Sequence, residues 1–363
     1  MTSLPLDICA YLLRFINNDK DKVRLMLTCK ELSKSKVYFT KQININKIRG
    51  LRWFDNFINI KNVNSLKRLP LHITHLRFSK KFKEPIRQCV PSTVTHLMFG
   101  EKFNQDIDGY IPDSVQEIRF GYFFNRSIDN LPSSITYLKF GYFFDRPIKK
   151  LPLALTYLSF GGYFSQPIDG QIPQSVKFLI FFGHFNQSVD NLPSSITHLT
   201  LSWRFNQDVN NLPISLTHLE FNGFFDRDVN NLPSSLTHLK FSNYFNQNVD
   251  NLPSSLTHLK FGNYFDQNVD NLPSSLTHLK FGDFFNKPIY NLPPSLTHLT
   301  FGYGFDRSIN NLPSSINHLI ISANNYYKKN FRTIASSSIT YLTLLKGSLS
   351  ENYQRSGDIF VRS

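Results

Sequence analysis

The sequence predicts a mainly β fold, a parallel β-solenoid built of coils of about 20 residues with a small helical domain at the N-terminus. Three observations predict this class. Proline recurs at a nearly fixed interval from Pro70 to Pro313. Large apolar residues recur in fixed columns at the same interval, and each repeat contains one short segment in which polar and apolar residues alternate.

The repeat is clearest in the copy from Asn251 to Asp270, which reads N-L-P-S-S-L-T-H-L-K-F-G-N-Y-F-D-Q-N-V-D. Its large apolar residues are Leu252, Leu256, Leu259, Phe261, Phe265 and Val269. One copy is too short to bury these side chains against itself, whereas stacked copies can bury them. Because each buried side chain contributes roughly 1.5–3 kcal/mol, contacts between coils are expected to be the main stabilising term.

The residues from His258 to Phe261 alternate as polar, apolar, polar, apolar, the pattern of a half-buried strand. We therefore expect one short strand per coil in a parallel stack. The rest of the coil contains a Leu-Pro step, which fixes the proline φ and favours extended geometry in the leucine before it. Helices are not expected in the return path.

Two motifs carry a resemblance to known repeats. Phe124-Asn125-Arg126-Ser127-Ile128 and Phe205-Asn206-Gln207-Asp208-Val209 resemble the FNIP repeats of amoebae and giant viruses, and the Leu-Pro pattern is similar to short leucine-rich repeats. The resemblance covers Ile73 to Ile321 and implies a leucine-rich-repeat-like solenoid. Tyr264 stands where leucine-rich repeats place their ladder asparagine.

Charge is distributed unevenly along the 363 residues. The whole chain has 40 Lys and Arg against 26 Asp and Glu, a formal net charge of +14. Residues 1–90 hold 19 of the basic and 6 of the acidic residues, so residues 91–363 hold 21 and 20. A nucleic-acid groove along the repeats would need the opposite distribution, so we predict no nucleic-acid partner.

The compartment is predicted from cysteine usage and hydropathy. The cysteines Cys9, Cys29 and Cys89 fit no disulfide or metal-ligand spacing, which indicates a reducing, intracellular environment. The apolar run from Leu4 to Ile16 is short and contains charged residues, so it predicts neither a membrane span nor a signal peptide. We expect a cytoplasmic protein with no membrane partner, located in the host cytoplasm if the source is a virus.

Residues Leu4 to about Tyr38 are predicted to form three short helices. Pro5 suits a helix start, Ile8, Leu12, Phe15 and Ile16 share one helical face, Val23, Met26 and Leu27 mark a second helix, and Thr28-Cys29-Lys30-Glu31 has the form of a capping box. This order and spacing resemble the F-box, which implies docking on the Skp1 adaptor of a cullin ubiquitin ligase. The residues that the resemblance assigns to adaptor contact are Leu4, Pro5, Ile8, Leu12, Phe15, Leu27, Cys29, Lys30 and Leu32. The alternative is a helical cap that only covers the first coil.

Four segments follow from these patterns. Residues 1–38 form the F-box-like domain, 39–69 are degenerate capping coils, 70–322 are the repeat solenoid, and 323–363 are an irregular terminal coil with a polar tail. The tail is expected to fray from Gly347 onward.

One exposed strand position is a histidine in nine coils. These are His75, His96, His198, His218, His238, His258, His278, His298 and His318. Strands in a parallel stack lie about 4.8 Å apart, so the imidazoles should form a straight file. A zinc site needs ligands that converge on one point, which a file does not provide. We expect a structural file of stacked rings, with use in partner recognition as the alternative.

Other exposed columns are candidates for partner binding. The next exposed strand position varies between coils, as a recognition surface does, and an aromatic row follows the strand. The predicted partner-binding residues are His218, His238, His258, His278, Lys240, Lys260, Lys280, Trp203, Tyr244 and Tyr264. A column of asparagines before the Leu-Pro step is expected to bond backbone groups within the turn; it comprises Asn130, Asn191, Asn211, Asn231, Asn251, Asn271, Asn291 and Asn311.

No catalytic constellation is present in the sequence. Acidic residues such as Asp250 and Asp270 occupy repeated loop positions, there is no glycine-rich phosphate loop, and no cysteine follows Cys89. We therefore predict no enzyme activity, no cofactor and no metal. The predicted function is a substrate-recognition adaptor of a cullin-type ubiquitin ligase, in which the F-box binds Skp1 and the repeats hold an unknown target protein. The main alternative is a repeat scaffold with no link to ubiquitin, and a third is a basic N-terminal module that anchors the repeats to nucleic acid or an anionic membrane.

Overall fold

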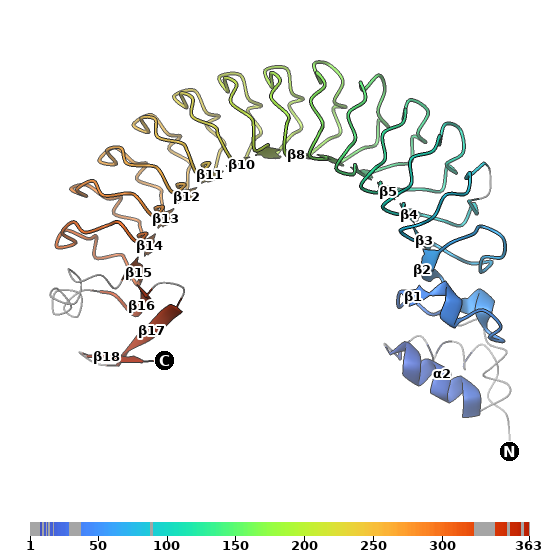
Figure 1. The fold of residues 1–363 in the computed structure, drawn as a ribbon. Coiled ribbons are helices and arrows are strands. Elements are labelled where there is room, and N and C mark those ends of the chain that lie inside the picture. The colour runs from blue at the N-terminus through green and yellow to red at the C-terminus, as the bar shows by residue number, and fades with distance from the viewer. Residues whose placement is uncertain are drawn as a thin grey trace. The chain divides into compact units, whose positions relative to one another are not determined.

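The computed structural model describes residues 8, 11, 13, 15–16, 18–28, 38–87, 90–322, 338–346, 349–356 and 359–362. Within these residues the fold is mainly β, a parallel solenoid with coils of about 20 residues and few helices, which confirms the predicted class (Figure 1). The chain divides into two compact units, Met1–Arg146 with Lys150–Leu155, and Pro147–Lys149 with Thr156–Ser363.

The first unit contains one described helix and six strands. Helix α2 (Asp19–Thr28) confirms the helix predicted around Val23 to Leu27, and its two acidic residues suit the positive end of a helix dipole. The strands are β1 (Ile43–Asn44), β2 (Asn59–Val63), β3 (His75–Phe78), β4 (His96–Met98), β5 (Glu117–Arg119) and β6 (Tyr137–Lys139). Each strand pairs in parallel with the next. Two 3₁₀ turns, η2 (Ile45–Lys47) and η3 (Phe54–Asn56), lie between β1 and β2.

The second unit contains the most regular coils. Its strands are β7 (Tyr157–Phe160), β8 (Phe178–Phe181), β9 (His198–Leu201), β10 (His218–Phe221), β11 (His238–Lys240), β12 (His258–Lys260), β13 (His278–Lys280), β14 (His298–Thr300), β15 (His318–Ser322), β16 (Tyr341–Lys346), β17 (Leu349–Ser356) and β18 (Ile359–Arg362). From β7 to β16 the pairing is parallel and joins equivalent positions, so His218 faces His238 and Glu220 faces Lys240.

The C-terminal segment differs from the sequence prediction. Strand β17 pairs antiparallel with β16, and β18 pairs antiparallel with β17, where fraying from Gly347 was expected. Strand β17 reads L-S-E-N-Y-Q-R-S, a polar sequence with no apolar face. A polar sequence does not by itself predict fraying, because the outer edge of β16 offers backbone N–H and C=O groups to any segment that can pair with them.

Each coil turns at the Leu-Pro step and then enters its strand. In the coil of β12, the Leu256 N–H donates to the Pro253 carbonyl at 3.1 Å and closes a turn. The His258 N–H then donates to the Thr237 carbonyl of the preceding coil at 3.0 Å, which starts the strand pairing. No helix occurs in the described residues between 70 and 322, which confirms that the return path is extended chain and turns.

Two columns of phenylalanine form the centre of the core. Phe241 and Phe245 belong to one coil and stack with ring centroids 3.8 Å apart. Phe245 also lies 6.1 Å from Phe225 and 6.1 Å from Phe265, its equivalents in the neighbouring coils. All three of these equivalent rings are fully buried. The stacked-phenylalanine core expected from the sequence is therefore present, and each ring depends on both neighbouring coils.

A ladder of side-chain oxygens joins successive coils at the Asn or Asp that follows the second phenylalanine. Oδ1 of Asn246 accepts the backbone N–H of Asp266 at 2.8 Å, and Oδ1 of Asp266 accepts the N–H of Asn286 at 2.8 Å. The motif tolerates either residue because both supply the same acceptor oxygen. Leucine-rich repeats place their ladder asparagine at the position that Tyr264 occupies here. In this chain the ladder is formed two residues later, by Asp266 in the same coil.

The second serine of each L-P-S-S segment forms another ladder. Ser255 Oγ donates to the Leu236 carbonyl of the preceding coil at 2.7 Å, and Ser275 Oγ donates to the Leu256 carbonyl at 2.7 Å. The hydroxyl thereby satisfies a carbonyl group between coils that the strand pairing leaves free. Main-chain polar groups outside the short strands are thus bonded by repeated side chains.

The asparagine column before the Leu-Pro step behaves differently from the prediction. Asn251 Nδ2 donates to Oδ1 of Asn230 at 2.9 Å, and Asn271 Nδ2 donates to Oδ1 of Asp250 at 3.1 Å. These are side-chain bonds between neighbouring coils, where backbone bonds within one turn were expected. The periodic sequence identified the column, but the partner depends on which residue of the next coil lies beside it.

Glycine allows some coils to gain one residue. The steps from Pro91 to Pro112 and from Pro152 to Pro173 are 21 residues, against 20 for most other steps. Gly109 (φ 70°) and Gly170 (φ 65°) lie in the turns of these longer coils, in the left-handed region that glycine adopts without strain. The extra residue is therefore absorbed in the turn, and the strand register is kept.

Candidate partner-binding face

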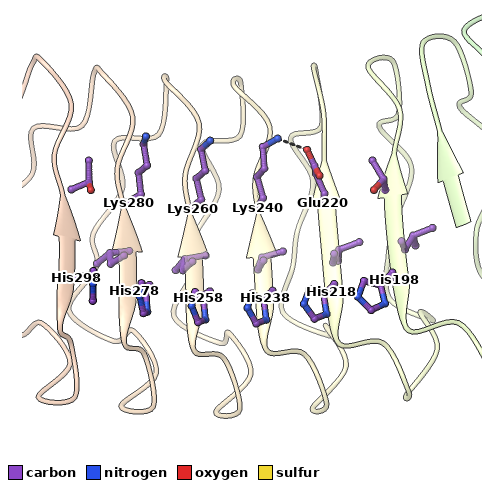
Figure 2. Close-up of a pocket in the computed structure, with 17 residues that line it drawn as sticks. His198, His218, Glu220, His238, Lys240, His258, Lys260, His278, Lys280 and His298 are labelled. Atoms are coloured by element: carbon purple, nitrogen blue, oxygen red, sulfur yellow. Dashed lines mark hydrogen bonds and ion pairs between the residues drawn. The ribbon is translucent and has the colours of Figure 1, made fainter. Parts of the chain in front are cut away.

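Stacked rings dominate the exposed side of strands β9 to β14, which we call the strand face. The imidazoles of His218 and His238 lie 4.2 Å apart between centroids, and those of His258 and His278 lie 4.1 Å apart (Figure 2). The interplanar angles along the row from His198 to His318 are 10–14°. The predicted file of stacked histidines is therefore present from His198 to His318, whereas the stack of His75 on His96 ends at Glu117, which occupies the equivalent position of the next strand.

The threonine before each histidine fixes the ring. Thr237 Oγ1 lies 2.9 Å from Nδ1 of His238 and also bonds to the Thr217 carbonyl of the preceding coil at 3.1 Å. His318 has the same arrangement with Asn317, whose Oδ1 lies 2.6 Å from Nδ1 and can only accept a hydrogen bond. The backbone of the neighbouring coil therefore sets the ring orientation through the threonine. The Thr-His pair repeats along the sequence and could have predicted this contact.

Burial holds the histidines in their neutral form. Burial, and after it the charges of His198, His238 and His258, lowers the pKa of His218 to about 4. Burial also lowers the pKa of His238, and burial followed by the neighbouring histidines lowers the pKa of His278. Loss of hydration is therefore a larger cause than repulsion between the imidazoles.

A row of lysines runs parallel to the histidines, two residues further along each strand. Lys240 forms an ion pair with Glu220, shown as a dashed line in Figure 2. Burial, and then the charges of Lys280 and Lys240, lowers the pKa of Lys260, and Glu220 acts in the opposite direction. The lysine row is therefore a cluster of like charges that only one carboxylate of the strand face offsets.

The two rows line a hollow of about 530 Å³ on the strand face. Its lining includes all the predicted histidines and lysines, namely His218, His238, His258, His278, Lys240, Lys260 and Lys280. Glu220, His198, His298, Thr200 and Thr300 also line the hollow and were not among the predicted partner-binding residues. They occupy the same two strand positions as the predicted histidines and lysines, so the repeat pattern alone could have identified them.

A second hollow of about 420 Å³ begins where the strands end, and we call it the glycine trough. Its lining includes Lys240, Lys260, Lys280, Asn243, Asn263, Asp283, Gly262, Gly282, Gly302 and Trp203. The glycines form part of the floor because the coils approach closely there: a Cβ on Gly262 would lie 1.8 Å from the Ser242 carbonyl oxygen. The lysine row thus borders both hollows.

The aromatic row is a separate feature. The rings of Tyr244 and Tyr264 stack with centroids 5.0 Å apart, and Trp203 packs edge-on against Phe224 at 5.6 Å. Between 43 and 49% of Trp203, Phe224, Tyr244 and Tyr264 is exposed. Trp203 lines the glycine trough, whereas Tyr244 and Tyr264 line neither hollow. The structure therefore brings the predicted histidines and lysines together and leaves these tyrosines apart from them.

The predicted adaptor-binding residues are only partly described. Ile8 and Phe15 are 45% and 67% exposed, and Leu27 lies in α2. Leu4, Pro5, Leu12, Cys29, Lys30 and Leu32 lie outside the described residues, as do Cys9 and Cys89 and most of the predicted capping box.

In the described part of the chain, no three His, Cys, Asp or Glu side chains come together in a way that could hold a metal ion. The parallel histidine rings explain this, since ligands of one ion must converge. Among the described helices, none combines the length and the apolar character needed to cross a bilayer.

The short parallel strands, the coils of about 20 residues and the side-chain ladders define a leucine-rich-repeat-like solenoid of the kind suited to protein binding. The FNIP Repeat family matches residues 88–123, 103–143, 124–153, 144–183, 185–224, 228–264, 245–284, 265–304 and 285–324. The chain belongs to the FNIP-repeat family, as the resemblance of its motifs implied.

Two solved structures are similar to this chain. CroV588, described as a novel circular leucine-rich-repeat protein, is 38% identical with a TM-score of 0.64, over 75% of this chain and 47% of CroV588. The chain therefore spans about half the length of that protein. YopM from Yersinia enterocolitica WA-314 is 17% identical with a TM-score of 0.46, over 73% of this chain and 63% of YopM. A comparison with curated proteins gives no match.

Proposed function

We propose that this protein is a non-catalytic adaptor whose strand face holds a partner protein and whose N-terminal segment docks on a Skp1-like subunit of a cullin ubiquitin ligase. The strand face carries the first half of the proposal. Its ring and backbone positions are constant from coil to coil, while the exposed position beside the rings varies as Thr200, Glu220, Lys240, Lys260, Lys280 and Thr300. Varied side chains on a rigid frame are what selective recognition of a protein requires.

Exposed apolar side chains in the N-terminal segment support the second half. Ile8, Tyr11 and Phe15 are 45%, 59% and 67% exposed, and the rings of Tyr11 and Phe15 are in contact at 5.0 Å. A segment that served only to cap the first coil would bury such side chains, whereas a docking segment keeps them available. Ile8 and Phe15 are also two of the residues that the F-box resemblance assigns to Skp1 contact. Such an adaptor would act in the cytoplasm, of the host if the source is a virus.

The ligase link is tested by binding purified Skp1, alone and in complex with a cullin. We expect the full chain to bind, deletion of residues 1–38 to abolish binding while the repeats stay folded by circular dichroism, and Ile8→Asp with Phe15→Asp to weaken it at least tenfold. The matched control places the same two charges on the exposed apolar residues Ile214 and Tyr290, which are 80% and 66% exposed. Skp1 binding that survives the deletion, or absence of binding by the full chain, would refute the ligase half of the proposal.

A repeat scaffold without a ubiquitin role is the second candidate, favoured by the strand face alone. Its test is affinity capture of cellular proteins with mass spectrometry, comparing the parent chain with Thr200→Arg and Thr300→Arg, which obstruct the strand face. Ser234→Arg and Ser254→Arg add the same charge at exposed loop positions. Partners that the face variant loses and the loop variant keeps support the scaffold, and equal capture by both variants contradicts it.

A further inference from the structure

The lysine row has more positive charge than its neighbours neutralise. Glu220 pairs with Lys240, the first lysine of the row. Within the part of the chain that the structure describes, neither Lys260 nor Lys280 forms an ion pair. Both lysines are exposed and face one another across adjacent strands, in register. Their strands lie about 4.8 Å apart, so the fold itself holds two like charges on neighbouring positions.

The pair of lysines Lys260 and Lys280 is electrostatically unfavourable when no anion is bound. Burial and the charges of Lys280 and Lys240 lower the pKa of Lys260, so the ammonium form is destabilised where it stands. A carboxylate placed between Lys260 and Lys280 would attract both ammonium groups and would remove their mutual repulsion. The cluster thus gains more from one bound carboxylate than either lysine would gain alone.

The glycine trough provides the space for such a group. Gly262 and Gly282 lie two residues beyond Lys260 and Lys280 and line the trough, which has a volume of about 420 Å³. Asn243 and Asn263 also line it and can supply amide donors to a carboxylate oxygen. A carboxylate that enters the trough therefore meets lysine ammonium groups and asparagine amides.

We propose that the glycine trough, with Lys260 and Lys280, takes the carboxylate side chains of an acidic segment from the partner protein, laid across strands β11 to β13. The inference rests on the proposed function, because it names the chemistry of the partner that the strand face holds. Glu220 and Thr300 stand at the two ends of the lysine row and limit the basic stretch to three coils, or roughly 10–15 Å. That length suits a few residues of peptide, whereas nucleic acid would favour a longer basic track.

The test measures binding of the full chain to the fluorescein-labelled peptide Gly-Glu-Gly-Glu-Gly-Glu-Gly by fluorescence anisotropy at low salt. We expect saturable binding that weakens at least tenfold when glutamine replaces each glutamate of the probe. Lys260→Gln with Lys280→Gln should cause a similar loss, and Lys260→Arg with Lys280→Arg should retain binding. The control variant Lys81→Gln with Lys102→Gln removes the same charge from exposed positions of the first unit and should bind within twofold of the parent.

Three results would overturn the inference. The first is equal loss in the Lys260/Lys280 and Lys81/Lys102 variants, and the second is no binding of the acidic peptide by the parent. The third is tighter binding of a labelled 20-nucleotide oligothymidylate that also depends on Lys260 and Lys280, which would assign the row to nucleic acid. Failure of the proposed function is distinct: it would leave peptide binding intact while the Thr200 and Thr300 variants capture the same cellular proteins as the parent.

Discussion

The neutral histidine row makes the stability of the repeats depend on pH. The unfolded chain has an ordinary histidine pKa of about 6.5, and the folded pKa of His218 is about 4. Between these values the unfolded chain binds more protons than the folded chain, so the free energy of unfolding falls as the pH falls. The stability is fully present above about pH 6.5 and is lost as the pH drops through 6.5 toward 4.

The magnitude follows from the proton difference. At pH 5.5 an unfolded histidine is about 90% protonated and a group of pKa about 4 is a few per cent protonated, which gives a slope of about 1.2 kcal/mol per pH unit. The His218 ring is partly exposed, and solvent screening reduces this figure to roughly half. Burial lowers the pKa of His238, His258 and His278 as well, so these residues steepen the slope in the same direction.

Urea unfolding of the parent chain at several pH values between 7 and 4.5 measures this slope. We expect His218→Gln to reduce it by about 0.6 kcal/mol per pH unit, and His238→Gln with His258→Gln and His278→Gln to flatten it further. The comparison uses slopes because loss of ring stacking lowers stability at every pH. Tyr244→Phe with Tyr264→Phe is the control, since these changes alter a second stacked row of the same coils and leave every histidine in place. Equal slopes in the parent and the histidine variants would refute the reasoning.

Three further predictions concern the contacts between coils. Phe245→Ala should lower the free energy of unfolding by roughly 3–5 kcal/mol, because a fully buried ring is lost; hydrogen exchange should show the loss of protection first in the two flanking coils, and unchanged protection there would contradict the stacked core. Gly262→Ala should destabilise by about 3 kcal/mol, the upper end of the overpacking range, because its Cβ would lie 1.8 Å from the Ser242 carbonyl oxygen; a neutral effect in denaturant melts would show that the coils can separate. Asn246→Ala should cost about 1–3 kcal/mol by leaving the Asp266 N–H without its acceptor, whereas Asn246→Asp keeps the acceptor and should be nearly neutral; equal effects of the two changes would contradict the ladder.

The features predicted from sequence are those that depend on one coil at a time. The alternation from His258 to Phe261 places His258 and Lys260 outward and Leu259 and Phe261 inward, which is their observed burial. The Leu-Pro step excludes a helix through the local geometry of proline. Stacking of His258 on His278 follows from period alone, because equivalent positions of adjacent parallel strands face each other.

The features that were missed depend on which residue of the next coil lies alongside. Asn251 bonds to Asn230, and Asn246 bonds to the N–H of Asp266, yet both are asparagines in fixed columns. The residues around them in the sequence do not indicate which of the two side chains bonds to a backbone N–H and which bonds to another side chain. The lowered pKa of His218 is likewise not readable from the spacing, since its main cause is burial of the ring, which depends on packing. Strand β17 was missed because it is held by the edge it pairs with and has no alternating pattern.

The ladders between coils allow the strand face to lengthen by duplication of whole coils. The bonds of Ser255, Asn246 and Thr257 to the neighbouring coil all join residues 19 or 20 positions apart. A duplication of 20 residues would restore every one of these bonds, and each added coil would extend the strand face by about 4.8 Å. Copy number would therefore set the length of the proposed binding face, while the variable strand position, such as Lys260, would set the charge that each copy contributes to it.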